Sequence, residues 1–343
     1  MAQRPPQTGH GLILGKFLPP HLGHQFLADF ARAYVDRLTI LVGTLQAEPI
    51  PGRLRHRWMS EMAPGAEVLH LTDENPQEPH EHPDFWRIWH DSIRRLVPSG
   101  PDLVFASEPY GLPLAEILGA RFVPVDLDRL QAPISGTRIR EDPLGNWRFI
   151  PPPVRPWFVR RVCLIGPEST GKTVLAQRLA AHYGTVWAAE YARGLIASQG
   201  DVFGAEDIPR FVRGQIASEE ALARQANRVL ICDTDVLTTT IWSDWFYGDC
   251  PAWIRAEADR RDYDLYLLCE PDCPWVDDPQ RFLPGQREAF RDRCLEALDS
   301  RGRTYVRIGG DWEDRFQQAV RAVDGLLARP GEAARAAFYR AVA

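Results

Sequence analysis

The octapeptide GPESTGKT, residues 166–173, constrains the fold of this chain more than any other segment. It matches the phosphate-binding pattern G-x-x-x-x-G-K-[S/T] at every fixed position. The apolar run RVCLIG leads into it, and the helical pattern KTVLAQRLAAHY begins with its last two residues. A strand, a glycine-rich loop and a helix in this order form one unit of a parallel α/β sheet, and the backbone N–H groups of the loop can surround a phosphate.

This loop is predicted to bind ATP, with Lys172 at the β- and γ-phosphates and the Thr173 hydroxyl on Mg²⁺. Arg281 and Arg287 lie on the Pro/Gly-interrupted segment WVDDPQRFLPGQREAF, which has the composition of a mobile lid, although a solvated loop also fits. Arginines on a lid stabilise the charge of a transferred phosphoryl group. The predicted ATP-binding residues of this half are Gly166, Glu168, Ser169, Thr170, Gly171, Lys172, Thr173, Arg281 and Arg287.

Acidic residues follow two further strand patterns of this half. The apolar run VLIC leads into Asp233 and Asp235, and in P-loop proteins such a strand supplies the carboxylate that holds the magnesium shell. Either aspartate is alternatively the N-cap of the next helix. Glu190 and Arg193, in WAAEYARGLI, suit proton acceptance from a substrate hydroxyl and phosphate binding, but an ordinary surface pair has the same spacing. No guanine-recognition motif of the N-K-x-D kind is present, which favours a small-molecule kinase over a GTPase.

Strand-like and helical patterns alternate along the chain, which indicates the α/β class with parallel sheets covered on both faces. A length of 343 residues exceeds one typical core and suits two domains. Four prolines in IPPPVRP, residues 150–156, can neither continue a helix nor pair in a central strand. We predict a first domain at 1–150, a stiff linker at 151–156 and a P-loop kinase-like domain at 157–343, of which residues 331–343 fit either a last helix or a tail.

The first half carries a second candidate phosphate site, GKFLPPHLGH at residues 15–24. It follows an apolar strand pattern, and His21 and His24 lie three residues apart at a helix start, where imidazoles and the helix dipole favour anions. Two such histidines alone are often filler. The segment ISGTRIR at residues 134–140 strengthens the interpretation, because it adds a helix-start cluster and two arginines suited to phosphate.

Together these two segments resemble the nucleotidyltransferase superfamily, whose signatures G-x-F-x-P-x-H-x-G-H and I-S-x-x-x-[I/V]-R are both complete here. The resemblance implies a Rossmann-like domain in which a phosphate on the acceptor attacks the α-phosphate of ATP and pyrophosphate leaves. It makes His21, His24 and Arg138 the catalytic residues and places Lys16 near an acceptor phosphate. The implied ATP-binding residues are Gly15, Lys16, Phe17, His21, His24, Ser135, Thr137 and Arg138.

A nucleotidyltransferase domain followed by a P-loop kinase is similar to the bifunctional NadR family, which joins a nicotinamide-nucleotide adenylyltransferase to a ribosylnicotinamide kinase. The segments SEPYG, EYAR and DTD also match that family. The resemblance implies that the kinase phosphorylates the 5′-hydroxyl of nicotinamide riboside, and that the first domain adenylylates the product, nicotinamide mononucleotide (NMN), to NAD. The expected partners are therefore ATP, nicotinamide riboside, NMN and NAD, with Mg²⁺ as the cofactor.

The resemblance also implies roles for individual residues. Lys172 acts on ATP, Thr173 and Asp233 hold the metal, and Glu190 and Asp233 compete for the role of general base. The implied substrate residues are Trp86, Trp89, Glu190, Arg193 and Asp235. The two tryptophans either stack on nicotinamide or fill the core. Two alternative functions stay open: a non-catalytic protein that senses NAD and ATP, and an active kinase whose adenylyltransferase domain is slow or only binds its ligands.

Composition argues against several other classes. A net charge of −6 gives no excess of Lys and Arg, so no nucleic-acid partner is expected. No run approaches 18 apolar residues and the first ten residues do not resemble a signal peptide, so we expect no membrane insertion. Six sparse cysteines indicate buried thiols in a reducing cytoplasm. About ten residues precede the first strand, too few for the helix-turn-helix of some family members, so no repressor role is expected; a homo-oligomer is allowed.

Overall fold

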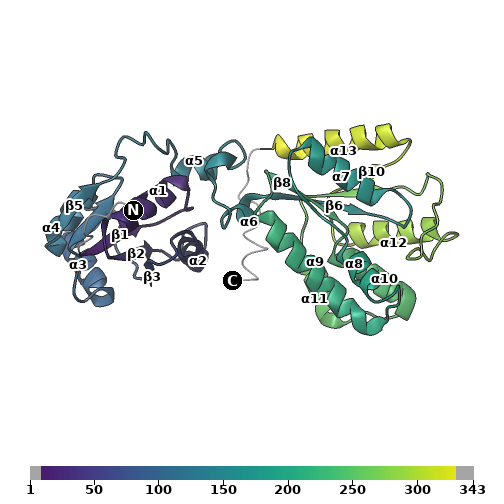
Figure 1. Cartoon of the computed structure of the whole chain (residues 1–343), viewed down its shortest axis with the longest axis horizontal. Helices are drawn as coiled ribbons and strands as arrows, with labels where there is room; N and C mark the ends of the chain where they lie inside the picture. The colour runs from purple at the N-terminus through teal and green to yellow at the C-terminus, as the bar shows by residue number, and fades with distance from the viewer. Residues whose placement is uncertain (1–8, 330–343) are drawn as a thin grey trace, which may run out of the picture. The chain divides into compact units, whose positions relative to one another are not determined.

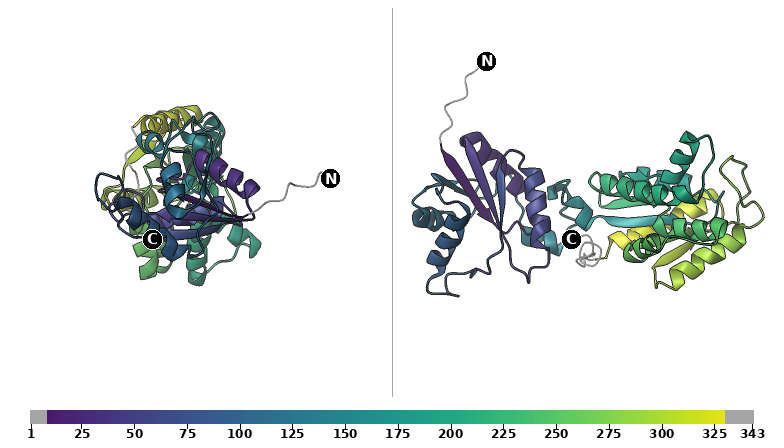
Figure 2. Two further views of the ribbon diagram at one scale, coloured as in Figure 1. Left: turned by 90° about the vertical axis from the view of Figure 1, so that its left-hand side faces the viewer. Right: turned by 90° about the horizontal axis from the view of Figure 1, so that it is seen from below.

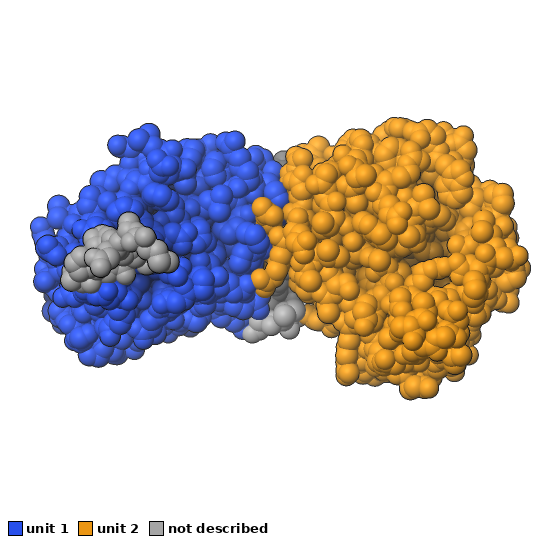
Figure 3. Space-filling model, viewed as in Figure 1, with its two compact units in different colours: residues 1–154, 342–343 blue, residues 155–341 orange. Residues whose placement is uncertain are grey.

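The computed structural model describes residues 9–329, and residues 331–343, which the sequence assigns to a helix or a tail, lie outside that range. The chain divides between Val154 and Arg155 into two compact units, which Figure 3 shows in different colours. Each unit contains one five-stranded sheet, and the predicted α/β class is confirmed. Within the described range, no helix combines the length and the apolar character that crossing a membrane requires.

The first unit is built on a parallel sheet with the strand order β3-β2-β1-β4-β5. The strands are β1 (His10–Gly15), β2 (Arg37–Gly43), β3 (Glu67–Leu71), β4 (Leu103–Ala106) and β5 (Arg121–Pro124). The central strands β1, β2 and β4 are buried almost throughout, because helices cover both faces, and they therefore read as continuous apolar runs. The order of the strands reverses at β1, and in such sheets ligands bind outside the carboxyl ends of the strands at that point.

Helices cover both faces of this first sheet (Figures 1 and 2). They are α1 (Leu22–Tyr34), α2 (Gly52–Met62), α3 (Phe85–Leu96), α4 (Gly111–Leu118), α5 (Gly136–Glu141) and the 3-10 turn η1 (Trp147–Phe149). On one face, Ile93 of α3 and Leu114 of α4 pack against Leu12 and Val104 of the sheet. The chain crosses from β1 to β2 in the opposite direction to its crossing from β4 to β5, so right-handed connections place α1 on the other face.

The second unit contains a parallel sheet with the order β10-β9-β6-β8-β7. The strands are β6 (Arg160–Ile165), β7 (Trp187–Ala188), β8 (Val229–Asp233), β9 (Leu265–Cys269) and β10 (Tyr305–Ile308). The register pairs Leu164 of β6 with Asp233 of β8 and Ile165 of β6 with Leu268 of β9. The carboxyl ends of β6, β8 and β9 therefore lie side by side, and residues that follow these strands meet at one edge.

The helices of the second unit form two groups, with α7 and α13 together on one face of the sheet and α9, α10 and α11 together on the other (Figure 1). The helices are α6 (Arg155–Phe158), α7 (Lys172–His182), α8 (Tyr191–Ser198), the 3-10 turn η2 (Ala205–Asp207), α9 (Ile208–Ala223), α10 (Val236–Tyr247), α11 (Ala252–Arg260), α12 (Arg287–Asp299) and α13 (Trp312–Leu327). The core on the first face joins Leu175 of α7 and Val323 of α13 to Val162 and Leu267 of the sheet.

The structure adds to the sequence analysis in two places. Sequence patterns assigned no helix to the region of α2, because its buried face contains the charged Arg55, fully buried beside Trp58 and Met59. The proline-rich segment at residues 151–156 is also more than a spacer. Val154 is buried within it, and its last residue, Pro156, lies in the short helix α6.

Candidate active sites

The phosphate-binding loop of the second unit joins the carboxyl end of β6 to the N-terminus of α7. Gly166 and Gly171 have φ angles of +137° and +79°, which strain any residue with a side chain. A Cβ atom at Gly166 would also lie 2.7 Å from the carbonyl oxygen of Cys269. Lys172 Nζ donates to the carbonyl oxygens of Gly166 and Pro167, at 3.0 and 2.8 Å. The ammonium group therefore lies on the loop that would hold a phosphate.

Asp233 faces this loop from the neighbouring strand β8. Thr173 Oγ1 donates to Asp233 Oδ2 at 2.5 Å, while Asp233 Oδ1 is buried and has no hydrogen-bond partner within residues 9–329. Burial raises the pKa of Asp233, and the nearby Lys172 charge opposes that rise. An unpaired carboxylate oxygen beside a threonine hydroxyl is a donor set that suits Mg²⁺ at a nucleotide phosphate.

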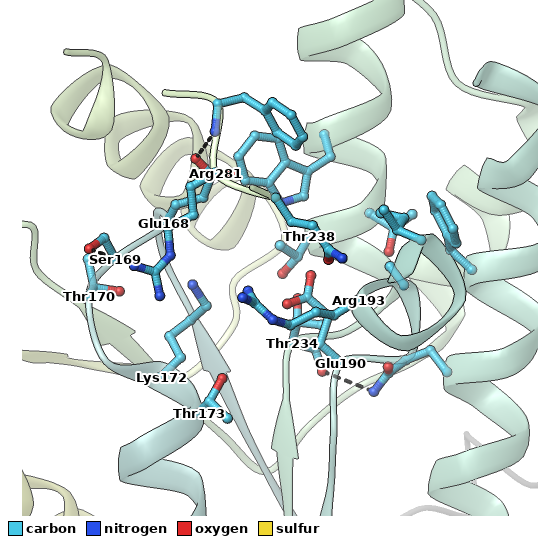
Figure 4. Close-up of a pocket in the computed structure, with 18 of the residues that line it drawn as sticks. Glu168, Ser169, Thr170, Lys172, Thr173, Glu190, Arg193, Thr234, Thr238 and Arg281 are labelled. Atoms are coloured by element: carbon cyan, nitrogen blue, oxygen red, sulfur yellow. Dashed lines mark hydrogen bonds between the residues drawn. The ribbon is translucent and has the colours of Figure 1, made fainter. Parts of the chain in front are cut away.

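Glu190 and Arg193 reach the same place from the start of α8, where Glu190 is the N-terminal cap residue. Figure 4 shows their side chains converging with Lys172 on one cavity. Burial, followed by the charge of Asp233, raises the pKa of Glu190 to about 7. Arg193 forms an ion pair with Asp278, which lies between β9 and α12. Glu190 can therefore exchange a proton near neutral pH.

The cavity has a volume of about 190 Å³ and an aromatic wall. The predicted residues that line it are Glu168, Ser169, Thr170, Gly171, Lys172, Thr173, Glu190, Arg193 and Arg281. Sequence reasoning missed the wall, which is formed by Ile196, Phe203, Ile208, Phe211, Trp242, Phe246 and Phe282. Trp242 and Phe246 stack with ring centroids 5.3 Å apart. Because the wall comes from several separate segments, the one available signal was the aromatic run WSDWFY at the end of α10.

The predicted lid segment contacts the phosphate-binding loop directly. The Glu168 carboxylate accepts hydrogen bonds from the backbone N–H groups of Phe282 and Leu283, at 2.8 and 3.0 Å, and Figure 4 draws one of these two bonds. Arg281 Nη1 lies 3.4 Å from Ser169 Oγ. Burial raises the pKa of Glu168, although these N–H groups favour its ionised form. The segment is therefore bound to the phosphate-binding loop through Glu168.

Four predicted residues of this half lie outside the cavity, and three of them belong to or contact the phosphate-binding loop. Asp233 is 1% exposed and lies behind Thr173, to which it is hydrogen-bonded. Gly166 belongs to the base of the loop, against β9. Arg287, at the start of α12, donates from Nη1 to the Ser169 carbonyl oxygen at 3.4 Å. These three residues support the loop from behind and do not face the cavity.

The structure corrects the assignment of Asp235 to the substrate. Asp235 is the N-cap of α10, and its Oδ1 accepts from the backbone N–H and from the hydroxyl of Thr238, each at 2.8 Å. Its Oδ2 accepts from the Tyr266 hydroxyl at 2.9 Å, and the residue is 1% exposed. Both oxygens are engaged away from the cavity, so the alternative interpretation, a helix cap, describes this aspartate.

The first unit contains a larger cavity, of about 980 Å³, at the carboxyl ends of β1, β2 and β4. This is the point where the order of the strands reverses. The Tyr110 hydroxyl donates to the Leu14 carbonyl oxygen and so joins the segment after β4 to the end of β1. The predicted residues that line the cavity are Gly15, Lys16, Phe17, His21, His24, Trp86, Trp89, Ser135 and Thr137.

His21 and His24 form a stacked pair at the start of α1, with ring centroids 3.7 Å apart. His21 Nδ1 accepts from the Gly23 N–H at 3.1 Å, and His24 Nδ1 accepts from the His21 N–H at 3.2 Å. Burial, with a contribution from Arg129, lowers the pKa of His21 to about 4. Burial, followed by the nearby His21 and Arg129, keeps the pKa of His24 well below its usual value. Both rings are therefore neutral at pH 7 and carry their proton on Nε2, as donors.

The structure also corrects the assignment of Arg138 to the ATP phosphates. Ser135 is the N-cap of α5, and the Arg138 side chain that follows donates to the Pro133 carbonyl oxygen at 3.2 Å, outside the cavity. Arg140, two residues later on this helix, lines the cavity instead. Arg129 also lines it and was missed, because it lies in a loop that matches no motif. Two arginines therefore supply positive charge here, and neither is the one predicted.

The remaining predicted residues of the first cavity combine several contacts. Lys16 is half exposed, and its Nζ lies 3.6 Å from Glu48. Trp86 and Trp89 line the cavity and also pack against the core, so both roles weighed for them are compatible. Phe17 is 2% exposed and its ring meets the His24 ring edge-on at 4.8 Å, which helps to hold that histidine.

Fold and cavities together define an α/β protein that joins a nucleotidyltransferase-like unit to a P-loop kinase-like unit. A family model described as an AAA domain matches residues 161–315. The trifunctional NAD biosynthesis/regulator protein NadR of Escherichia coli (strain K12) is 32% identical over 342 residues, which cover 92% of this chain and 83% of that protein. The chain belongs to the NadR family.

Two solved structures of NadR proteins share this fold. One is a NadR protein in complex with NR, with a TM-score of 0.76 and 20% identity, which covers 96% of this chain and 99% of that chain. The other is a NadR protein in complex with NAD and AMP-PNP, with a TM-score of 0.73 and 21% identity, which covers 95% of this chain and 98% of that chain. Sequence identities of 20 and 21% show a similarity of fold alone, and the coverage shows that this similarity extends over both units.

Proposed function

We propose that this chain catalyses two consecutive reactions of NAD salvage: phosphorylation of nicotinamide riboside to NMN in the second unit, and adenylyl transfer from ATP to NMN in the first. One observation carries this proposal, namely that each unit has its own cavity with its own phosphate-binding loop. The names of the relatives support the choice of substrates, because the E. coli relative is a NAD biosynthesis protein and one solved NadR protein is a complex with NR.

In the kinase reaction, we assign the general base to Glu190. Its pKa of about 7 suits a base at neutral pH, and it lines the cavity, whereas Asp233 lies behind Thr173. Glu190 accepts the proton of the 5′-hydroxyl as that oxygen forms a bond to the γ-phosphorus of ATP. The bond between the γ-phosphorus and the bridging oxygen breaks, and ADP leaves. Lys172 and Arg281 stabilise the negative charge on the transferred group.

Thr173 and Asp233 are the residues of this chain that would hold Mg²⁺. Within residues 9–329 no cluster of three or more His, Cys, Asp or Glu side chains is arranged for a metal ion. Water and the nucleotide phosphates would therefore provide its other ligands, as is usual for Mg²⁺. When bound, the ion neutralises charge on the phosphate oxygens.

In the adenylyl transfer, an NMN phosphate oxygen forms a bond to the α-phosphorus of ATP, and the bond to the pyrophosphate leaving group breaks. This exchange of phosphate bonds releases no proton, so the site needs charge stabilisation and not a base. His21 and His24, as neutral Nε2–H donors, contribute hydrogen bonds to the phosphate chain, and Arg129 and Arg140 contribute positive charge. Ser135 and Thr137 bound the same cavity from α5.

Product analysis by mass spectrometry tests the proposal, with nicotinamide riboside or NMN supplied together with Mg-ATP. The wild-type chain should convert both compounds to NAD. Lys172→Ala should lose phosphorylation of the riboside to NMN by at least about 100-fold but keep conversion of NMN to NAD, and His24→Ala should still phosphorylate the riboside to NMN but lose the conversion of NMN to NAD.

Two results would contradict this division of labour. One is the loss of both steps in either folded single variant. The other is undetectable turnover by the wild type together with saturable binding of NAD and ATP, which would favour a sensing role.

A further inference from the structure

Trp312 is the most exposed tryptophan of the described chain. It is the first residue of the helix α13, whose other side packs into the core of the second unit. Its exposed fraction is 54%, whereas Trp58 and Trp157 are each 2% exposed. A large aromatic side chain that stays in solvent loses the free energy that burial would provide. Its position beside the phosphate-binding loop suggests what covers it.

The Trp312 ring is in contact with the phosphate-binding loop itself. A Cβ atom at Gly171 would lie 2.3 Å from Cζ3 and 2.8 Å from Cη2 of the indole, so the benzene edge of the ring touches the backbone of that glycine. Gly171 is the N-cap of α7, the helix whose N-terminus would hold the nucleotide phosphates. The ring therefore stands at the outer edge of the site proposed for ATP.

Two arginines fix the backbone around this ring. Arg315, 2% exposed, donates from Nε to the Gly310 carbonyl oxygen at 2.8 Å and from Nη1 to the Thr170 carbonyl oxygen at 3.4 Å. Arg178 of α7 donates from Nη1 to the Trp312 carbonyl oxygen at 3.2 Å. The segment that carries the ring is thus tied to the phosphate-binding loop by Arg315 and to α7 by Arg178, so the exposed ring sits on a fixed support.

Two residues of α7 lead from the cavity toward this ring. Val174, in the first turn of α7, lines the cavity and is 55% exposed, so it lies at the cavity rim. Arg178 lies one turn further along the same face of α7, beside Trp312. Since the cavity takes the acceptor and the transferred phosphoryl group, the rest of the nucleotide must leave the loop along its outer side.

We propose that Trp312 is a stacking platform for the nucleobase of the phosphate donor in the second unit. This inference rests on the proposed function, and it adds a residue that no motif of the chain includes. The flat indole offers ring area beside a site for phosphate, and stacking on an aromatic side chain recognises a base by that area. The donor class that fits is a purine nucleoside triphosphate.

The test compares a donor that has a base with a ligand that has none. Stacking on one aromatic side chain contributes enough binding free energy for its loss to weaken binding about tenfold. Trp312→Ala should therefore raise the KM for ATP in riboside phosphorylation about tenfold and leave kcat within about twofold of the wild-type value. Inorganic tripolyphosphate, which has no base, should inhibit the variant and the wild type with the same inhibition constant. Trp312→Phe, which keeps a smaller ring, should stay within about threefold of the wild-type KM.

Trp253→Ala is the matched control, because Trp253 is the other tryptophan with a largely exposed ring (43%) and, unlike Trp312, it has no atom among those nearest Gly171 of the phosphate-binding loop. It should leave the KM for ATP unchanged. An unchanged KM in Trp312→Ala would overturn the platform. Equal weakening of ATP and tripolyphosphate would overturn it too, because a damaged loop would then explain the effect.

Binding measurements separate this proposal from the proposed function. If the wild type phosphorylates no riboside, calorimetry with ADP and with pyrophosphate still tests the platform. Binding to the second unit is identified as the binding that is lost in Lys172→Ala. Trp312→Ala should then weaken ADP at that site about tenfold and leave pyrophosphate unchanged. The same affinity for ADP in the variant and the wild type would overturn the proposal.

Discussion

Glu190 has a pKa of about 7, because it is buried and lies near the charge of Asp233. As a base it must be ionised, so the rate of riboside phosphorylation at saturating substrate should rise with pH through about 7 and level off near pH 8. Glu190→Gln keeps the shape but cannot accept the proton. It should lower kcat by about 10²- to 10⁴-fold and remove the rise, which ADP release measured between about pH 5.5 and 8.5 will show.

Unfolding measurements provide the control for this titration. A carboxyl whose pKa is higher in the folded protein than in the unfolded chain favours folding at low pH, and this contribution is lost as pH rises from about 4.5 to about 7. The free energy of unfolding of Glu190→Gln minus that of the wild type should therefore increase by up to roughly 3 kcal/mol between pH 5 and pH 8. Glu116→Gln, at an exposed position of α4, should show no such change. A pH profile that is the same for wild type and Glu190→Gln would exclude Glu190 as the base.

At the scale of elements, the N-terminus of α10 depends on one buried aspartate. Asp235 accepts three hydrogen bonds, from the Thr238 N–H, the Thr238 hydroxyl and the Tyr266 hydroxyl. Asp235→Ala removes the cap and leaves buried donors without partners, so it should lower the free energy of unfolding by about 3 kcal/mol in urea titrations. Asp311→Ala, at the exposed N-cap of α13, should cost about 1 kcal/mol. Equal losses in the two variants would contradict the role of burial.

Elements that carry their own signal were predictable from the sequence. The strands β1, β2, β4, β6, β8 and β9 are short apolar runs, and they alternate with helical patterns. The phosphate-binding loop was also predictable, because its glycines are required by local backbone geometry at Gly166 and Gly171. By contrast, α2 was missed because it buries Arg55, whose charge is met by Glu48 from another segment. A pattern within one element cannot show a partner that tertiary structure supplies.

The same limit applies to the candidate sites. His21 and His24, which the motif singled out, both line the first cavity, since they lie in one turn. The signature I-S-x-x-x-[I/V]-R has its fixed arginine at Arg140, which lines the cavity, whereas Arg138, the residue assigned to ATP, occupies a variable position of that signature and lies outside the cavity. Motifs could not find Phe203, which joins the aromatic wall from a loop far from the P-loop in sequence. Residues that face a cavity across the fold require the fold to be known.

At the scale of the whole chain, each cavity is lined by residues of one unit. The first cavity takes residues between Leu14 and Arg140, and the second takes residues between Glu168 and Phe282. Among residues 9–329, the lining that defines each cavity therefore comes from a single unit. If the proposed reactions are correct, NMN made in the second unit can be used by the first unit of a different molecule.

A mixture of two inactive variants tests this independence. Lys172→Ala retains the first site and His24→Ala retains the second, so neither alone should convert nicotinamide riboside to NAD. Mixed in equal amounts, the two variants supply one working copy of each site. Once free NMN reaches the KM of the first site, the mixture should make NAD at a rate within about twofold of that of wild-type protein with the same concentration of each working site. The double variant Lys172→Ala/His24→Ala added to either single variant is the control and should restore nothing. A mixture that makes no NAD, although His24→Ala releases ADP with the riboside and Lys172→Ala uses added NMN, would show that NMN is not released and that the intermediate must stay on one chain.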